Sequence, residues 1–102
     1  MKVKNIGDAD DWFSVLQTSK KTQSAVMTLK PGQSSGEKAE AHKDSEQVLI
    51  VLEGEVFAEV EGETRNLKTG DVILIPAGVK HKFTNKSQKK VVTFNTYSPP
   101  EY

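Results

Sequence analysis

The sequence contains no cysteine among its 102 residues, which excludes a disulfide framework and thiolate chemistry. It also has no apolar run of transmembrane length and no segment resembling an N-terminal signal. We therefore expect a soluble, cytoplasmic protein with no membrane partner.

An excess of charge of either sign is also absent. Fourteen Lys and Arg residues balance fourteen Asp and Glu residues, so the formal net charge is zero. Proteins that bind nucleic acids generally attract them with a basic surface, and we therefore expect no nucleic-acid partner. The length is that of one domain, residues 1–102, and leaves no room for a second catalytic domain.

Sustained helical periodicity is the third absence. Short apolar or alternating runs occur instead, and turn residues such as Gly54 and the pair Glu61-Gly62 separate them. The predicted strands cover residues 12–16, 24–29, 47–54, two parts of 55–67, 72–75, a segment from 81 onward, and 91–97. About eight short strands with such turns are typical of an all-β sandwich or barrel.

The stretch GDVILIPAGVKHKFTN contains one of the two histidines. Its run VILI predicts a short buried strand, and Pro76 with Gly78 predicts a tight corner after it. Beyond the corner, His81 is two residues from Phe83, so the two side chains share the inward face of a strand. An inward imidazole beside an aromatic ring is either a hydrogen-bonded core group or a ligand.

The second histidine lies in the polar segment EAHKDSEQ. Glu40, His42 and Asp44 are spaced by two and share a face if the segment is extended. Gln47 follows in the next strand. These groups provide a carboxylate, an imidazole and a carboxamide, and His81 provides a second imidazole. Together they are the parts of a divalent metal site, provided that the strands carrying them meet.

At this point the chain resembles the cupin superfamily. The stretch 70–85 matches the second cupin motif at its five fixed positions: Gly70, Pro76, Gly78, His81 and Asn85. Residues 32–54 resemble the first motif, with Gly54 as its last glycine. Counting back from Gly54 places Gln47 where the family has glutamate, His42 at the second histidine and Glu40 at the first.

The resemblance implies one cupin domain with a double-stranded β-helix, or jelly-roll, fold. In this family three histidines and one glutamate usually hold Mn, Fe, Ni, Co, Cu or Zn in the barrel mouth. The corresponding metal ligands here are Glu40, His42, Gln47 and His81. The two replacements keep the carboxylate count, so a dication would leave the same net charge of about +1. Because a carboxamide is a poorer donor than a carboxylate, Asp44 or Glu46 is an alternative ligand.

The functional hypotheses follow from this site. The first is a small metalloenzyme of dioxygenase, isomerase or decarboxylase type that acts on a small molecule. The second is a non-catalytic module for a sugar or carboxylate ligand, and the third is metal-free sugar isomerisation or epimerisation by histidine acid–base chemistry. No catalytic residue is assigned. We expect a homodimer, an apolar barrel wall at Leu49, Val51, Phe83 and Phe94, and a turn or strand-end hydrogen bond at Asn85.

Overall fold

The computed structural model describes residues 1–102 and contains eight strands and one three-residue 3₁₀ helix, η1 (Ile6–Asp8). The strands are β1 (Phe13–Thr18), β2 (Gln23–Leu29), β3 (Glu46–Glu53), β4 (Glu55–Val60), β5 (Glu63–Lys68), β6 (Val72–Ile75), β7 (His81–Thr84) and β8 (Val91–Ser98). The predicted all-β fold is therefore confirmed. No helix in the structure is long and apolar enough to cross a membrane.

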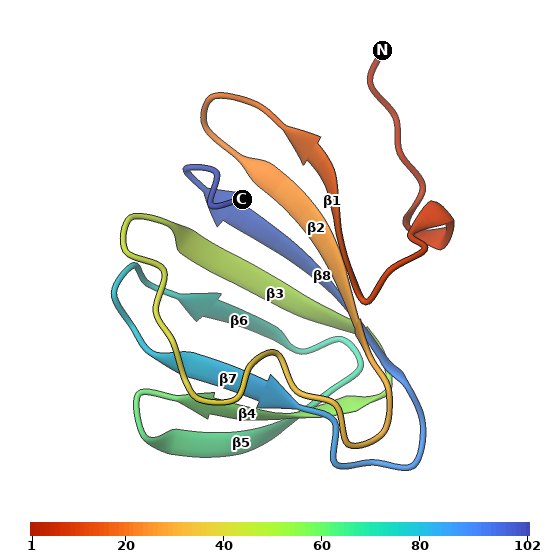
Figure 1. The fold of residues 1–102 in the computed structure, drawn as a ribbon, viewed down its shortest axis with the longest axis vertical. Helices are drawn as coiled ribbons and strands as arrows, with labels where there is room; N and C mark the ends of the chain where they lie inside the picture. Colours follow the sequence, from red (N-terminus) through yellow and green to blue (C-terminus); the bar gives the residue numbers. More distant parts are fainter.

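The strands form two antiparallel sheets that face each other as the walls of a barrel (Figure 1). One sheet has five strands in the order β1-β2-β8-β3-β6, and the other has three in the order β5-β4-β7. The chain crosses repeatedly between the two sheets, which gives the predicted jelly-roll arrangement. Strand β8 lies between β2 and β3, although those two strands come much earlier in the sequence.

Gly54 makes one of these crossings possible, because it joins β3 of the larger sheet to β4 of the smaller one. Its φ is +85°, in the left-handed region that favours glycine. A Cβ atom at this position would lie 2.6 Å from the carbonyl oxygen of Lys90. The last glycine of the first motif is thus required by backbone geometry.

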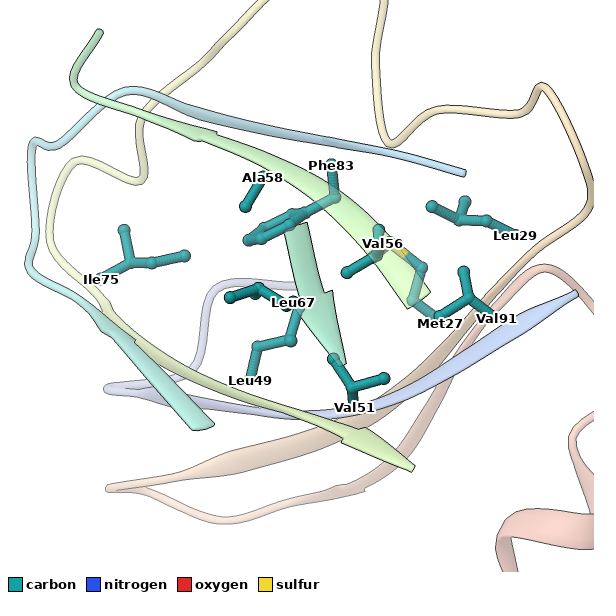
Figure 2. Close-up of a cluster of buried hydrophobic side chains, with 10 residues drawn as sticks. All are labelled: Met27, Leu29, Leu49, Val51, Val56, Ala58, Leu67, Ile75, Phe83 and Val91. Carbon is teal, nitrogen blue, oxygen red and sulfur yellow. The ribbon is translucent and has the colours of Figure 1, made fainter. Parts of the chain in front are cut away.

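The core fills the space between the sheets (Figure 2). Its buried side chains are Met27, Leu29, Leu49, Val51, Val56, Ala58, Leu67, Ile75, Phe83 and Val91. Leu49, Val51 and Phe83 thus form the apolar wall as predicted. The same prediction for Phe94 is wrong, because the inward row of β8 consists of the alternating residues 91, 93, 95 and 97.

Strand β6 also differs from its prediction as a buried strand. It lies at the edge of the larger sheet, and only Ile75 is buried. Val72 and Leu74 point away from the core and are 61% and 58% exposed. They belong to an apolar patch, the outer sheet face, which also includes Val48, Ile50, Leu52 and Phe94.

Candidate functional site at the barrel mouth

The polar segment before β3 brings the first motif to the second. Residues near its end run beside β7, where Glu40 and His81 exchange two backbone hydrogen bonds of 3.1 and 2.9 Å. The backbone N–H of Gly78 donates to the carbonyl of His42 at 2.7 Å. These bonds place the His42 ring 4.8 Å from the His81 ring, measured between centroids.

A pocket of about 400 Å³ opens at this end of the barrel. Gln47, the second residue of β3, pairs with Tyr97 near the end of β8, so both side chains face the mouth. The lining combines polar groups with aromatic rings: Trp12, Phe13, Met27, Ser35, Gly36, Lys38, Glu40, Ala41, His42, Gln47, His81, Phe83, Tyr97, Glu101 and Tyr102. It therefore offers both hydrogen-bonding and apolar contacts to a small ligand.

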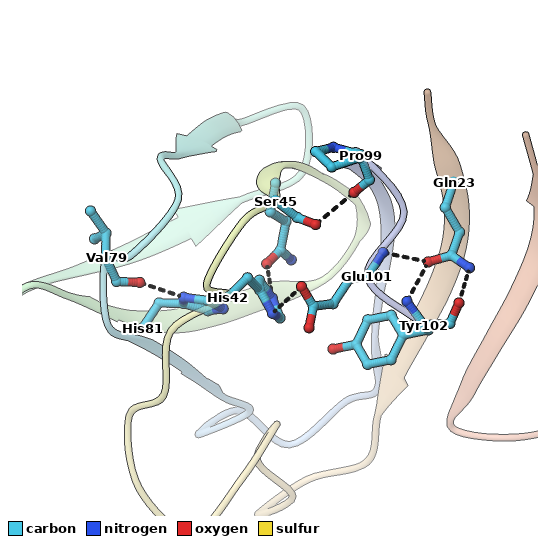
Figure 3. A network of polar contacts seen from close by, with 9 residues as sticks. Gln23, His42, Ser45, Val79, His81, Pro99, Glu101 and Tyr102 are labelled. Atoms are coloured by element: carbon cyan, nitrogen blue, oxygen red, sulfur yellow. Dashed lines mark hydrogen bonds and ion pairs between the residues drawn. The ribbon is translucent and has the colours of Figure 1, made fainter. Parts of the chain in front are cut away.

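The His81 ring is held by the backbone. Its Nδ1 lies 3.0 Å from the carbonyl oxygen of Val79, which only accepts hydrogen bonds, so Nδ1 carries the hydrogen (Figure 3). Burial lowers the pKa of His81, the Val79 hydrogen bond opposes that shift, and the nearby His42 adds to it. His81 is accordingly neutral at pH 7, with a lone pair on Nε2.

His42 lies between two polar groups. Its Nδ1 is 3.7 Å from Oε1 of Glu101 (Figure 3). Its Nε2 is 3.0 Å from Oε1 of Gln47. Nitrogen and oxygen atoms 3.0 Å apart share a hydrogen when Nε2 is protonated. The same pair of atoms has about the separation of adjacent ligands on one ion with bonds of about 2.1 Å.

A row of buried hydrogen bonds continues from Gln47 into the barrel. The Gln47 amide nitrogen donates to Oδ1 of Asn95 at 2.9 Å, and the Asn95 amide nitrogen donates to Oγ1 of Thr93 at 3.0 Å. The Thr93 hydroxyl donates to the carbonyl of Met27, also at 3.0 Å. We call Gln47, Asn95 and Thr93 the buried polar row.

The segment after β8 closes one side of the pocket. Ser45 donates to the carbonyl of Pro99 at 2.6 Å. The Gln23 amide nitrogen donates to the Tyr102 carbonyl at 2.7 Å, and its oxygen accepts from the backbone N–H groups of Glu101 and Tyr102 at 3.2 and 2.8 Å (Figure 3). These contacts hold Glu101 beside His42.

Two tyrosines complete that wall. The rings of Tyr97 and Tyr102 lie 5.1 Å apart between centroids, and each meets the His42 ring edge to face. Burial is the main cause that raises the pKa of Tyr97 far above its usual range, and it also raises the pKa of Tyr102. Both hydroxyls are therefore neutral at pH 7.

The structure brings the four predicted ligands, Glu40, His42, Gln47 and His81, to one pocket. Asp44 is exposed and does not line it, and the same holds for Glu46. No group of three or more imidazole or carboxylate side chains is arranged to hold a metal ion. Glu40, His42 and His81 line the same pocket, but their carboxylate and two imidazoles do not converge as such a group, and the carboxamide of Gln47 lies beside His42.

Sequence reasoning missed other residues of the site: Asn95, Tyr97, Glu101 and Tyr102. They lie on β8 and the segment after it, outside both motifs. An asparagine inside a strand is unusual because asparagine is depleted in strands, and this was the one signal that pointed to Asn95.

A larger hollow lies elsewhere on the surface. Its volume is about 780 Å³, and it is bounded by the N-terminal residues around η1 and by outward side chains of β2 and β8. No histidine lines it. The candidate site is therefore the smaller pocket at the mouth.

The chain belongs to the cupin family, because the family model described as "Cupin domain" matches residues 25–97. No curated protein matches the chain. Among solved structures, it is similar to BH2720 from Bacillus halodurans, with 24% identity and a TM-score of 0.88 over 98% of this chain and 82% of the other. It is also similar to TT1209 from Thermus thermophilus, with 26% identity and a TM-score of 0.84 over 97% of this chain and 98% of the other.

A further similar structure is a "predicted oxalate decarboxylase" from Thermotoga maritima. It is 23% identical, with a TM-score of 0.77, and the match covers 84% of this chain and 77% of the other. At this identity the likeness shows the fold alone. One barrel hosts many chemistries, so function has to be argued from the pocket.

Proposed function

We propose that this cupin binds a small molecule in the mouth pocket, with a divalent metal ion held by Glu40, His42, Gln47 and His81. The observation that carries the proposal is the geometry of His42 and Gln47, whose Nε2 and Oε1 atoms lie 3.0 Å apart beside a neutral His81. His81 contributes its free Nε2 because its Nδ1 donates a hydrogen bond to the carbonyl of Val79, a common arrangement of metal-binding histidines.

The donor set suits an ion of intermediate hardness. Two imidazoles with a carboxamide and a carboxylate fit Mn, Fe, Ni, Co, Cu or Zn better than a set made only of oxygen atoms would. The exposed Glu40 carboxylate lies at the rim and supplies the negative charge. Lewis-acid activation of a substrate oxygen is the chemistry that such an ion supplies when bound.

The remaining residues bind and orient the ligand. The rings of Phe13, Phe83, Tyr97 and Tyr102 offer apolar contacts, and the neutral tyrosine hydroxyls offer hydrogen bonds. Turnover of a chelating substrate would make the protein a dioxygenase, isomerase or decarboxylase. Binding without turnover would make it a recognition module.

Elemental analysis tests the metal. The protein is purified without chelator beside His81→Ala and Glu40→Ala, and Glu46→Gln serves as a control at a carboxylate outside the pocket. We expect near-stoichiometric metal in the wild type and the control, and loss of metal in both alanine variants. Wild-type protein that takes up none of the six ions, even after incubation with each, would refute the metal proposal.

A metal-free site is the second candidate, and one observation favours it. The 3.0 Å contact between His42 and Gln47 is already a good hydrogen bond when His42 carries a hydrogen on Nε2. In that state the neutral His81 is the base of the pocket, and it can move a proton on a sugar-like ligand at pH 7. Ligand turnover in the presence of chelator would support this candidate.

We also propose that the outer sheet face is the contact of a homodimer. Val48, Leu52, Val72 and Leu74 are each at least 36% exposed on one side of the larger sheet. An exposed apolar patch next to an edge strand needs cover in water. Light scattering should give a dimer mass for the wild type and a monomer mass for the double variant Val72→Glu, Leu74→Glu. A wild-type monomer would refute the proposal.

A further inference from the structure

The buried polar row is unusual for a barrel interior. Gln47 is 3% exposed, and Asn95 and Thr93 are fully buried. Burial of an amide or hydroxyl group costs free energy unless its hydrogen bonds are replaced, whereas apolar side chains of similar size would carry no such requirement. The row therefore needs a reason other than the filling of space.

The hydrogen bonds of the buried polar row all run in one direction, from donor to acceptor toward the interior. The Met27 carbonyl at the inner end sets this direction. The carbonyl of Met27 only accepts, so the single hydrogen of the Thr93 hydroxyl points to it. The Thr93 oxygen then accepts from the amide nitrogen of Asn95, and Oδ1 of Asn95 is left facing Gln47. Gln47 must donate its amide hydrogen inward, which turns its oxygen toward the mouth.

The opposite end of this arrangement is also an acceptor. Oε1 of Glu101 lies 3.7 Å from Nδ1 of His42, and Gln23 holds the segment that carries Glu101. A distance of 3.7 Å is too long for a hydrogen bond, but the negative charge of the carboxylate favours the His42 tautomer with its hydrogen on Nδ1. In that tautomer the lone pair of Nε2 faces Oε1 of Gln47 across 3.0 Å.

Two acceptors facing each other at this distance leave a place for a cation. We propose that Asn95 and Glu101 are positioning residues, which turn the Gln47 oxygen and the His42 Nε2 lone pair toward one bound cation. The inference rests on the proposed metal site and adds two residues from outside both motifs. It requires neither residue to touch the ion.

The proposal explains the glutamine at position 47. Oδ1 of Asn95 needs a hydrogen donor, and a carboxamide supplies one whereas a carboxylate does not. Gln47 is in this view the partner that Asn95 requires, and not a glutamate that has lost its charge. Glutamine at position 47, where the family usually has glutamate, and asparagine at position 95 therefore depend on each other, because each supplies the other's hydrogen-bond partner.

Zinc affinity, measured by titration calorimetry, tests the proposal. Removal of a group that orients a ligand typically weakens metal binding about 10- to 100-fold, and we expect such a loss in Glu101→Gln and in Asn95→Leu. Glu46→Gln is the matched control for the first variant, and Thr96→Val, on the outward face of β8, controls for changes to that strand. Unchanged affinity in both test variants would overturn the proposal.

A second readout does not need the metal. In ¹⁵N-labelled protein kept in chelator, we expect the side-chain amide hydrogens of Gln47 to show nuclear Overhauser contacts to Thr93 and Asn95 and none to the His42 ring. Thr93→Val is the milder variant if Asn95→Leu does not fold, and it should lower zinc affinity in the same direction. Amide hydrogens of Gln47 next to His42 in the wild type would overturn the proposal.

The two readouts separate two failures. If wild-type protein binds none of the proposed metals, the proposed metal function fails, and the positioning toward a cation fails with it. If zinc binds but the Gln47 amide hydrogens face His42, the metal function stands and the positioning role of Asn95 is wrong.

Discussion

Two asparagines are completely buried in this barrel, one just beyond the end of β7 and one in the middle of β8, and the partners of their side chains differ. Asn85, beyond the end of β7, donates to the carbonyls of Leu29 and Lys89 at 2.9 and 2.7 Å, and its oxygen accepts from Ser87. The Asn95 side chain bonds only to other side chains, in a row that leads to the pocket. The first secures the backbone at the end opposite the pocket, and the second orients a side chain at the mouth.

This difference shows how one residue type serves stability or function according to its partners. Backbone carbonyls are fixed by the fold, so Asn85 fulfils the expected role of a strand-end hydrogen bond. The side chains around Asn95 depend on each other for their orientation, and a change in one is passed to the next. The two ends of the barrel should therefore respond differently to substitution.

Asn85→Ala should produce the largest loss of stability. It removes bonds to both carbonyls and to Ser87, and we expect the free energy of unfolding to fall by about 3 kcal/mol. Urea denaturation measures the loss, and zinc titration of the folded fraction should give the wild-type affinity. A variant that keeps its stability but loses zinc affinity would contradict the division between the two ends.

Gln47→Glu should come next, although it restores the residue usual in the family. Its carboxylate would face Oδ1 of Asn95 with no hydrogen to share, and we expect a loss of about 2 kcal/mol in metal-free protein. Gln88→Glu, at an exposed position, is the matched control and should have almost no effect. Equal stability of Gln47→Glu and wild type in chelator would show that the hydrogen bonds of the buried polar row can change direction without a loss of stability.

Gln23→Leu should have a smaller effect on stability and a clear local one. Without the amide of Gln23, the segment with Glu101 and Tyr102 is held less tightly, and we expect a loss of about 1 kcal/mol. Hydrogen exchange at these two backbone amides should quicken. The control is Gln88→Leu. Exchange as slow as in the wild type would mean that Ser45 and ring packing suffice to hold the segment.

The pH dependence of stability should show the smallest effect. Burial lowers the pKa of His81 in the folded protein, so below its ordinary value of 6.5 the unfolded chain binds more protons. In chelator, the free energy of unfolding should fall as pH falls from 6.5 toward the lower folded-state pKa. Above pH 6.5, His81 should contribute nothing to the pH dependence of stability. His81→Gln should show a shallower slope, and an equal slope in both proteins would refute the assignment.

Much of the fold and part of the site could be predicted from the sequence. Turn residues and alternation indicated the strands, and the spacing of the two motifs indicated His42 and His81. The pairing of these motifs depends on hydrogen bonds such as the one from Gly78 to the His42 carbonyl, which spacing alone does not reveal. The family resemblance supplied that information.

The polar contacts from β8 could not be predicted in the same way. In VVTFNTY the odd positions hold Val91, Thr93, Asn95 and Tyr97, whereas the even positions hold Val92, Phe94 and Thr96. Period-2 alternation gives two faces but does not say which one is inward. The more apolar face here is the outer one, because the hydrogen bonds of the buried polar row allow a polar face inside.

The central place of β8 in the larger sheet has a consequence for how the chain folds. Strands β2 and β3 do not pair with each other, and each needs β8 as its neighbour. A chain that has been synthesised only as far as β7 can form the three-stranded sheet but cannot close the other. We expect slow folding dominated by contacts distant in sequence, with the barrel and its pocket completed in the same late step.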